Sequence, residues 1–149
     1  MVRLEVIELA TPGAPAMDAL MSYAGVSDEG QRLILEGLLT TAFDAVQRSA
    51  DVALLEGKFR VCAEDHRGEV RVYMGGKVES VTDANGSAVV FNQRGRTVYV
   101  GESEYVEVVF TTTVNSADYT RLLPVVLRYA TALYDGKSGR ELNAILSEC

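Results

Sequence analysis

The chain has 149 residues, of which 48% are apolar and 23% are charged, and its formal net charge is −7. This length and composition fit one globular domain with its own core, so we expect residues 1–149 to form a single domain. The acidic balance disfavours tight binding to nucleic acid, because such binding needs Lys and Arg to displace counterions from phosphates.

The first elements in chain order are helices. A breaker cluster, Thr11-Pro-Gly-Ala-Pro15, precedes a short predicted helix over 16–24 that should end at Gly25. Asp28 is the expected N-cap of a long helix over about 29–50.

The long helix carries one apolar stripe at the i, i+3, i+4 spacing. The stripe consists of Ile34, Leu35, Leu38, Leu39, Ala42, Phe43 and Val46. Gln31 is spaced from Asp28 to complete a capping box, and Gln47 falls among the polar residues off the stripe. We therefore expect this helix to lie on a core with its other side in water.

From Lys58 onward the apolar period changes to two, which predicts strands. Alternation over 59–64 and 70–74 indicates a hairpin around Asp65–Gly68. Further strands are expected at about 77–82, 87–92, 96–100 and 104–113. Because the connections are short, we predict an antiparallel β meander over about 58–113. With helices on both sides of this block, the fold class is α+β.

The chain ends in two predicted helices. Pro124 is harmless at a first helical position, so we expect one helix over about 124–135, ending before Gly136. Ser138 and Glu141 have the spacing that opens another helix, over about 138–148. Residues 137–149 have two open interpretations: an extending C-terminal arm, or a helix packed on the body of the protein.

The charge is unevenly distributed along the chain. Residues 1–56 carry 3 basic and 9 acidic side chains, residues 57–100 carry 7 and 5, and residues 101–149 carry 4 and 7. Copies would attract one another if the middle of one met an end of the next. An ordinary solvated surface explains the same distribution.

Catalytic signatures are missing from the sequence. His66 lies in a predicted turn, and neither G-x-S-x-G nor a phosphate-binding glycine motif occurs. Cys62 and Cys149 have no metal-ligand or disulfide spacing. We predict no catalytic, cofactor-binding or metal-binding residues, and therefore no cofactor. Cys62 and Cys149 fit a reducing compartment.

No stretch approaches the roughly 18 to 20 apolar residues that cross a bilayer. Residues 1–8 carry acids where a secretory leader would be basic and then apolar. We expect an unexported protein with no membrane partner.

Three segments carry a resemblance to a known family. They are the long helix within Asp28–Val46, the strand Val106–Thr111, and the helix Leu123–Asp135. Together they resemble the head–tail connector, or adaptor, family of tailed bacteriophages and gene-transfer particles. In that family a strand of this kind leads to a proline-started helix ending in Leu-Tyr and an acidic residue. The family's aromatic-glycine turn is replaced here by Thr111–Ser116.

The resemblance implies a structural virion component and no enzyme. It implies a homo-oligomeric ring of about twelve copies, joining the capsid portal to a tail-side stopper or neck protein and lining the channel through which DNA passes without specific binding. The protein would reside in the virion neck, and in the host cytoplasm during assembly. The C-terminal segment of such proteins reaches the portal, which would make Arg140, Leu142, Ile145 and Leu146 partner-binding residues.

Two alternatives remain open. One is a small hydrolase or ligand-binding domain with a pocket between sheet and helices, using His66 or the tyrosines as polar groups. The other is a different ring of the tail or neck, such as the tail terminator, since neighbouring rings require no distinguishing chemistry.

Overall fold

The computed structural model describes residues 1–149 and contains two compact units. The strand unit comprises residues 1–10 and 56–113, and the helical unit comprises residues 11–55 and 114–149. The α+β class is confirmed. The single domain expected from the sequence stays a prediction.

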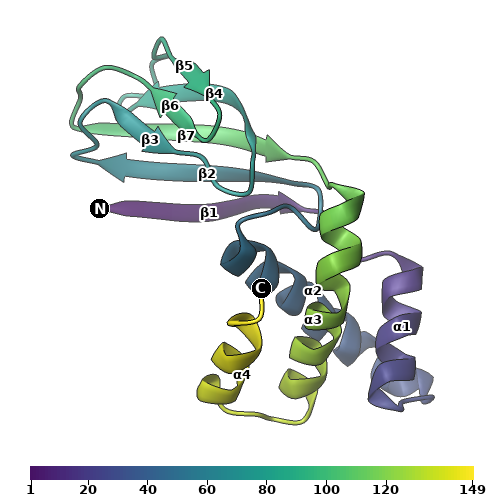
Figure 1. Ribbon diagram of the computed structural model, residues 1–149. Helices are drawn as coiled ribbons and strands as arrows, with labels where there is room; N and C mark the ends of the chain where they lie inside the picture. The colour runs from purple at the N-terminus through teal and green to yellow at the C-terminus, as the bar shows by residue number, and fades with distance from the viewer. The chain divides into compact units, whose positions relative to one another are not determined.

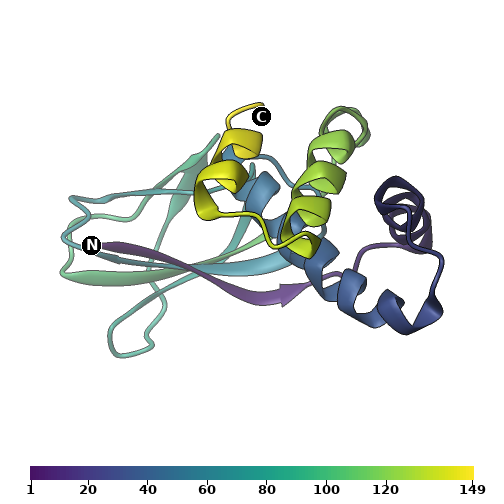
Figure 2. The same ribbon diagram turned by 90° about the horizontal axis from the view of Figure 1, so that it is seen from below.

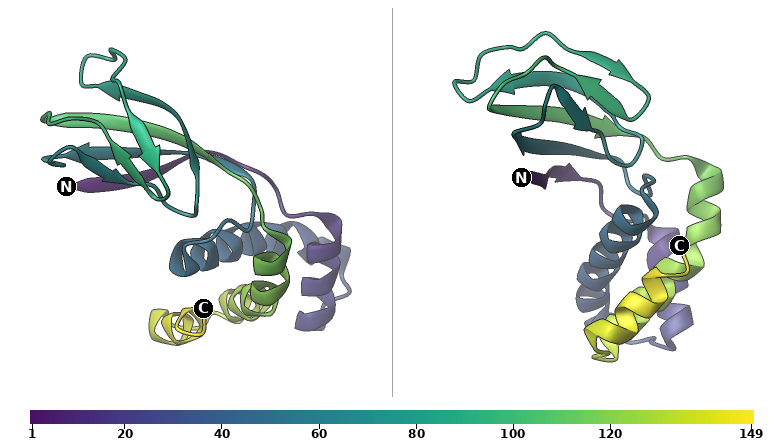
Figure 3. Two further views of the ribbon diagram at one scale, coloured as in Figure 1. Left: turned by 45° about the horizontal axis from the view of Figure 1, so that its top comes forward. Right: turned by 60° about the vertical axis from the view of Figure 1, so that its left-hand side comes forward.

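The strand unit contains two antiparallel sheets (Figure 1). The larger sheet has the order β1–β2–β7–β4, and its strands are Val2–Leu9, Gly57–Glu64, Tyr105–Thr112 and Lys77–Asp83. The smaller sheet has the order β3–β6–β5, and its strands are Glu69–Arg71, Thr97–Tyr99 and Asn92–Arg94. The smaller sheet lies across one face of the larger (Figure 3).

Alternating side chains of β2 and β7 build the core of the strand unit. The fully buried members are Phe59, Val61, Ala63, Val106, Val108 and Phe110. The rings of Phe59 and Phe110 stack with centroids 5.5 Å apart. A Cβ on Gly76 would collide with the Phe110 ring, so this position requires glycine. The period-two pattern thus identified the buried face correctly.

The antiparallel pairing is confirmed, whereas the hairpin predicted for 59–74 is wrong. β2 pairs with β1 and β7, and β3 belongs to the other sheet. The strand β1 was not predicted, and it supplies a neighbour that is remote in sequence. Because β7 pairs with β2 over the full eight residues, this long pairing replaces the short local one.

The strand predicted at 87–92 is wrong for most of its length. Only Ala88 forms a bridge, to Thr82, and Asn92 begins β5. Residues 87–89 run along the outer edge of β4, where the Val89 N–H donates to the Val81 carbonyl at 2.9 Å. This β-prone segment therefore lies at a sheet edge with little pairing of its own.

The helical unit contains α1 (Ala14–Ala24), α2 (Arg32–Ala50), α3 (Ser116–Tyr134) and α4 (Gly139–Leu146). The short 3-10 turn η1, Glu29–Gln31, precedes α2. α3 packs against the other three helices and lies between α1 and α4 (Figures 1 and 2). None of these helices combines the length and hydropathy that crossing a bilayer requires.

The predicted caps of α1 and η1 are found in the structure, but the capping box is wrong. Gly25 adopts a left-handed φ of 70° and ends α1. Asp28 accepts a hydrogen bond from the Gly30 N–H at 2.8 Å. The Gln31 amide oxygen instead accepts from the Tyr134 hydroxyl at 3.3 Å, which joins the start of α2 to the end of α3.

Two residues of α2 differ from the predicted stripe. Ile34 is 53% exposed, although its neighbour Leu35 in the same turn of α2 is fully buried, so Ile34 lies beside the packed face of the helix. Gln47 is fully buried, and its Oε1 accepts from the N–H groups of Leu54 and Leu55 at 3.1 and 3.3 Å. The turn after α2 buries these N–H groups, which need an acceptor. Gln47 provides it.

α3 begins at Ser116, so the prediction that this helix starts at Pro124 is wrong. Asn115 caps α3 by accepting from the N–H groups of Ala117 and Asp118 at 2.9 and 3.2 Å. Pro124 lies exposed inside the helix and cannot donate to the Thr120 carbonyl. The Asn115 cap thus extends the helix through the proline.

Candidate assembly surfaces

Three side chains on one face of the larger sheet, Glu5, Arg3 and Arg60, form an ion-pair group. Arg60 Nε and Nη2 donate to Glu5 Oε2 at 2.9 and 2.6 Å, and Arg3 Nε lies 2.8 Å from Glu5 Oε1. Arg60, followed by Arg3, holds the pKa of Glu5 below its usual range. A carboxylate held in its ionised form by two guanidiniums is a poor proton donor or acceptor. This group therefore orders the sheet surface.

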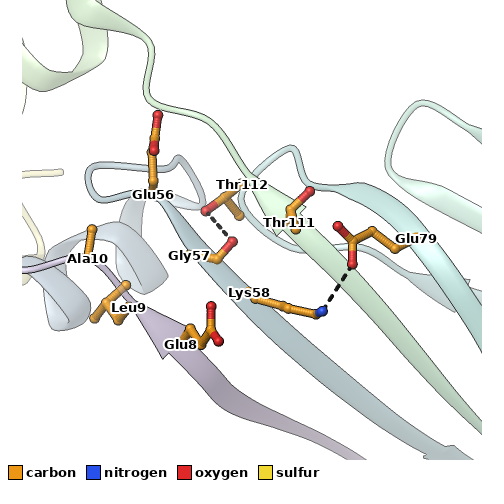
Figure 4. Close-up of a pocket in the computed structure, with 9 residues that line it drawn as sticks. All are labelled: Glu8, Leu9, Ala10, Glu56, Gly57, Lys58, Glu79, Thr111 and Thr112. Carbon is orange, nitrogen blue, oxygen red and sulfur yellow. Dashed lines mark hydrogen bonds and ion pairs between the residues drawn. The ribbon is translucent and has the colours of Figure 1, made fainter.

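An open depression of about 540 Å³ lies at one end of the same sheet (Figure 4). Its lining includes Glu8, Glu56 and Glu79, and Lys58 Nζ lies 3.3 Å from Glu79 Oε2. Figure 4 shows the three carboxylates at separate sides of the depression. No group of three acidic, histidine or cysteine residues in the chain is placed to hold a metal ion. The depression is an acidic surface that suits a basic side chain.

His66, the one candidate base, is held in the wrong tautomer for catalysis. The Gly68 N–H donates to His66 Nδ1 at 3.0 Å, so the proton of the neutral ring is on Nε2. Nε2 lies 2.9 Å from Ser103 Oγ and therefore donates to it. A general base must accept the serine proton instead. The His66–Ser103 contact thus fastens a turn to the loop before β7.

The predicted portal-binding residues lie on α4. Arg140 is exposed, whereas Leu142, Ile145 and Leu146 are half-buried because α4 packs on α3 and α2. Ser138 caps this helix as predicted, accepting from the Glu141 N–H at 3.4 Å. The structure thus gathers these four residues on one short helix without a fully buried side chain.

A bidentate ion pair links α3 to the residues that follow α4. Arg128 of α3 contacts both carboxylate oxygens of Glu148, with Nη2 to Oε1 at 2.8 Å. This hydrogen bonding lowers the pKa of Glu148. Both side chains are largely exposed, so the pair contributes little to holding α4 in place.

Exposed apolar side chains gather in two places that the sequence analysis did not identify. In the helical unit they include Tyr23, Ile34 and Leu33, the last 79% exposed. In the strand unit they include Val2, Val6 and Ile7 on β1 and Val90 beyond β4, besides Met1 and Tyr99. Val90 is 94% exposed. Apolar edges of this kind mark contact surfaces for proteins. Strong β propensity in Ser87–Phe91 was the signal available in the sequence.

The fold and these surfaces define an α+β protein whose candidate sites are contact surfaces. Comparison with solved structures finds the same fold in gene transfer agent (GTA) particles. One match is a chain in the neck of an empty GTA particle computed with C6 symmetry, with a TM-score of 0.64, 16% identity, and coverage of 98% of this chain and 94% of that chain. Another is in the virion of a native GTA particle, with a TM-score of 0.60, 18% identity, and coverage of 97% and 93%.

These matches establish a shared fold over nearly the whole chain. The sequence matches no protein-family model and no curated protein. The fold agrees with the family resemblance found in the sequence.

Proposed function

We propose that this protein is a structural component of a virion neck, that it assembles into a homo-oligomeric ring and that it turns over no substrate. The observation that carries the proposal is the fold shared with a chain of a GTA particle neck over 98% of this chain. The His66 tautomer supports a non-enzymatic role, because it leaves Ser103 without a base.

The specific role we propose is that of the head–tail adaptor. The ring would join the portal to a tail-side neck protein and line the DNA channel. A net charge of −7 suits a channel in which DNA must slide, because a lumen rich in Lys and Arg would hold phosphates. The sixfold symmetry used for the similar neck is compatible with about twelve copies and also with six.

The direct test is the location of the chain in purified particles. Cryo-electron microscopy should show the protein as a ring between portal and tail, and the number of copies per particle should be a multiple of six. A monomeric protein absent from purified particles would refute the neck assignment. A ring located at the tail-side end of the neck would support the tail terminator instead of the adaptor.

We further propose that α4 is the portal-docking element, with Arg140, Leu142, Ile145 and Leu146 making the contact. Helix α4 has no fully buried residue, and the residues that follow it are linked to α3 by one exposed ion pair. It can therefore exchange its contacts at low cost. An apolar stripe on such a helix suits a groove on a partner.

Truncation after Gly136 tests this docking role. The shortened chain should keep a folded helical unit by circular dichroism, yet fail to co-purify with portal-containing capsids. Glu148→Gln is the matched control, because it breaks the Arg128 pair and keeps the stripe, and it should still attach. Attachment of the truncated chain would show that the portal contact lies elsewhere.

A further inference from the structure

Within the strand unit, no further strand pairs with the outer edge of β1. In the edge strand β1, every second residue exchanges main-chain hydrogen bonds with β2. Contacts at the two ends of the pairing are those of the Glu64 N–H to the Met1 carbonyl and of the Ala10 N–H to the Glu56 carbonyl. The alternation of an antiparallel ladder then directs the N–H and C=O groups of Val2, Leu4 and Val6 away from β2. An eight-residue edge strand with free main-chain groups is a template for another strand.

The opposite edge of the same sheet is covered by the chain itself. The N–H of Asp83 donates to the Ser87 carbonyl at 2.9 Å, and the Val78 N–H donates to Gln93 Oε1 at 2.9 Å. Residues 87–89 thus run along the outer edge of β4, and Val90 and Phe91 follow them toward β5. This segment, Ser87-Ala-Val-Val-Phe91, has strong β propensity but only one bridge.

We propose that copies of this chain join edge to edge, with β1 of one copy pairing with residues 87–91 of the next. The inference rests on the proposed ring. A closed ring of more than two copies needs two different surfaces that meet head to tail, and the two borders of one sheet provide them. Pairing β1 with β1 would stop at a dimer.

The two edges match in length and chemistry. The free groups of β1 extend over residues 2–6, and the opposing segment also has five residues, about 16 Å of strand. The pairing would cover Val90 of one copy and the exposed Val2 and Val6 on β1 of the next copy. Residues 84–96 contain two arginines and no acid, and β1 carries Glu8 in addition to the Glu5 that Arg3 and Arg60 already neutralise. The charges therefore favour the pairing.

Incorporation into particles tests the pairing. Val90→Lys should reduce the amount of chain per purified particle, measured by quantitative mass spectrometry, at least ten-fold. Val2→Pro, which removes an outward N–H of β1, should act in the same direction. Val114→Lys is the matched control, because it places the same charge at an exposed valine of the helical unit that belongs to neither sheet edge, and it should leave incorporation unchanged. Thermal melting of each purified variant checks folding.

A photoactivatable residue at position 90 tests the identity of the neighbour. Within particles it should cross-link to a peptide of residues 1–10 from another copy. Normal incorporation of Val90→Lys, or cross-links from position 90 to another protein, would overturn the edge pairing while leaving a ring possible by other surfaces. Cross-links between two β1 strands would also overturn it. Absence of the unaltered chain from particles would instead overturn the proposed function.

Discussion

The buried amide of Gln47 is the most demanding polar position in the helical unit. Its Oε1 accepts from two backbone N–H groups, those of Leu54 and Leu55, in a turn where both residues are buried. Gln47→Met keeps the volume of the side chain and removes the acceptor. Each buried N–H left without a partner costs about 1–3 kcal/mol. We therefore expect Gln47→Met to lower the free energy of unfolding by about 2–6 kcal/mol.

Urea denaturation followed by circular dichroism at 222 nm measures this loss. The melting temperature should fall by roughly 4–24 °C if each kcal/mol shifts it by about 2–4 °C. Gln31→Met is the matched control in the same helical unit, because the Gln31 oxygen accepts only a side-chain hydroxyl at 3.3 Å. Its cost should stay near 1 kcal/mol. If Gln47→Met were as stable as the unaltered chain, the turn would have another source of acceptors and the reasoning would be refuted.

Two further predictions concern α3 and the sheet surface. Pro124→Ala restores an N–H for the Thr120 carbonyl at an exposed position of α3. It should raise the free energy of unfolding by about 1–2 kcal/mol, a value that already subtracts the entropy that the unfolded chain gains when proline is removed. A lower denaturation midpoint would contradict this. The pKa of Glu5 is lowered in the folded state, so its contribution is present above the unfolded value near 4.3 and is lost as the pH falls through the folded pKa. Denaturation midpoints measured between pH 7 and pH 3 should therefore fall less steeply for Glu5→Gln, and equal slopes would show that the Arg60 pair is not formed in solution.

Local patterns in the sequence determined much of the fold. Period-two alternation identified the buried faces of β2 and β7, and Gly25, Asp28 and Ser138 were correctly predicted as cap residues. These features depend on neighbours within a few residues. The absence of a catalytic motif in the sequence also directed the interpretation toward contact surfaces.

Pairing between distant segments could not be predicted in the same way. Periodicity indicates which side of a strand is apolar, but β2 had two competing partners, the nearby segment 70–74 and the remote strand β7. β2 pairs with β7 because eight residues of matched pairing outweigh the entropic cost of closing the longer loop. That cost grows only slowly with loop length. The predicted start of α3 was likewise wrong, because the prediction used Pro124 as the start signal and missed the N-cap at Asn115.

The candidate surfaces show the same division. The sequence by itself determined the amphipathic helix that carries Arg140 and Leu142, because its capping signal and its apolar stripe are local. Only the tertiary structure decided that Gln47 is buried, that β1 is a sheet edge, and that residues 87–89 run along the opposite edge with the following Val90 exposed. The physical reason is that solvent exposure and free main-chain groups depend on which distant segments pack together, and no local pattern of residues encodes that choice.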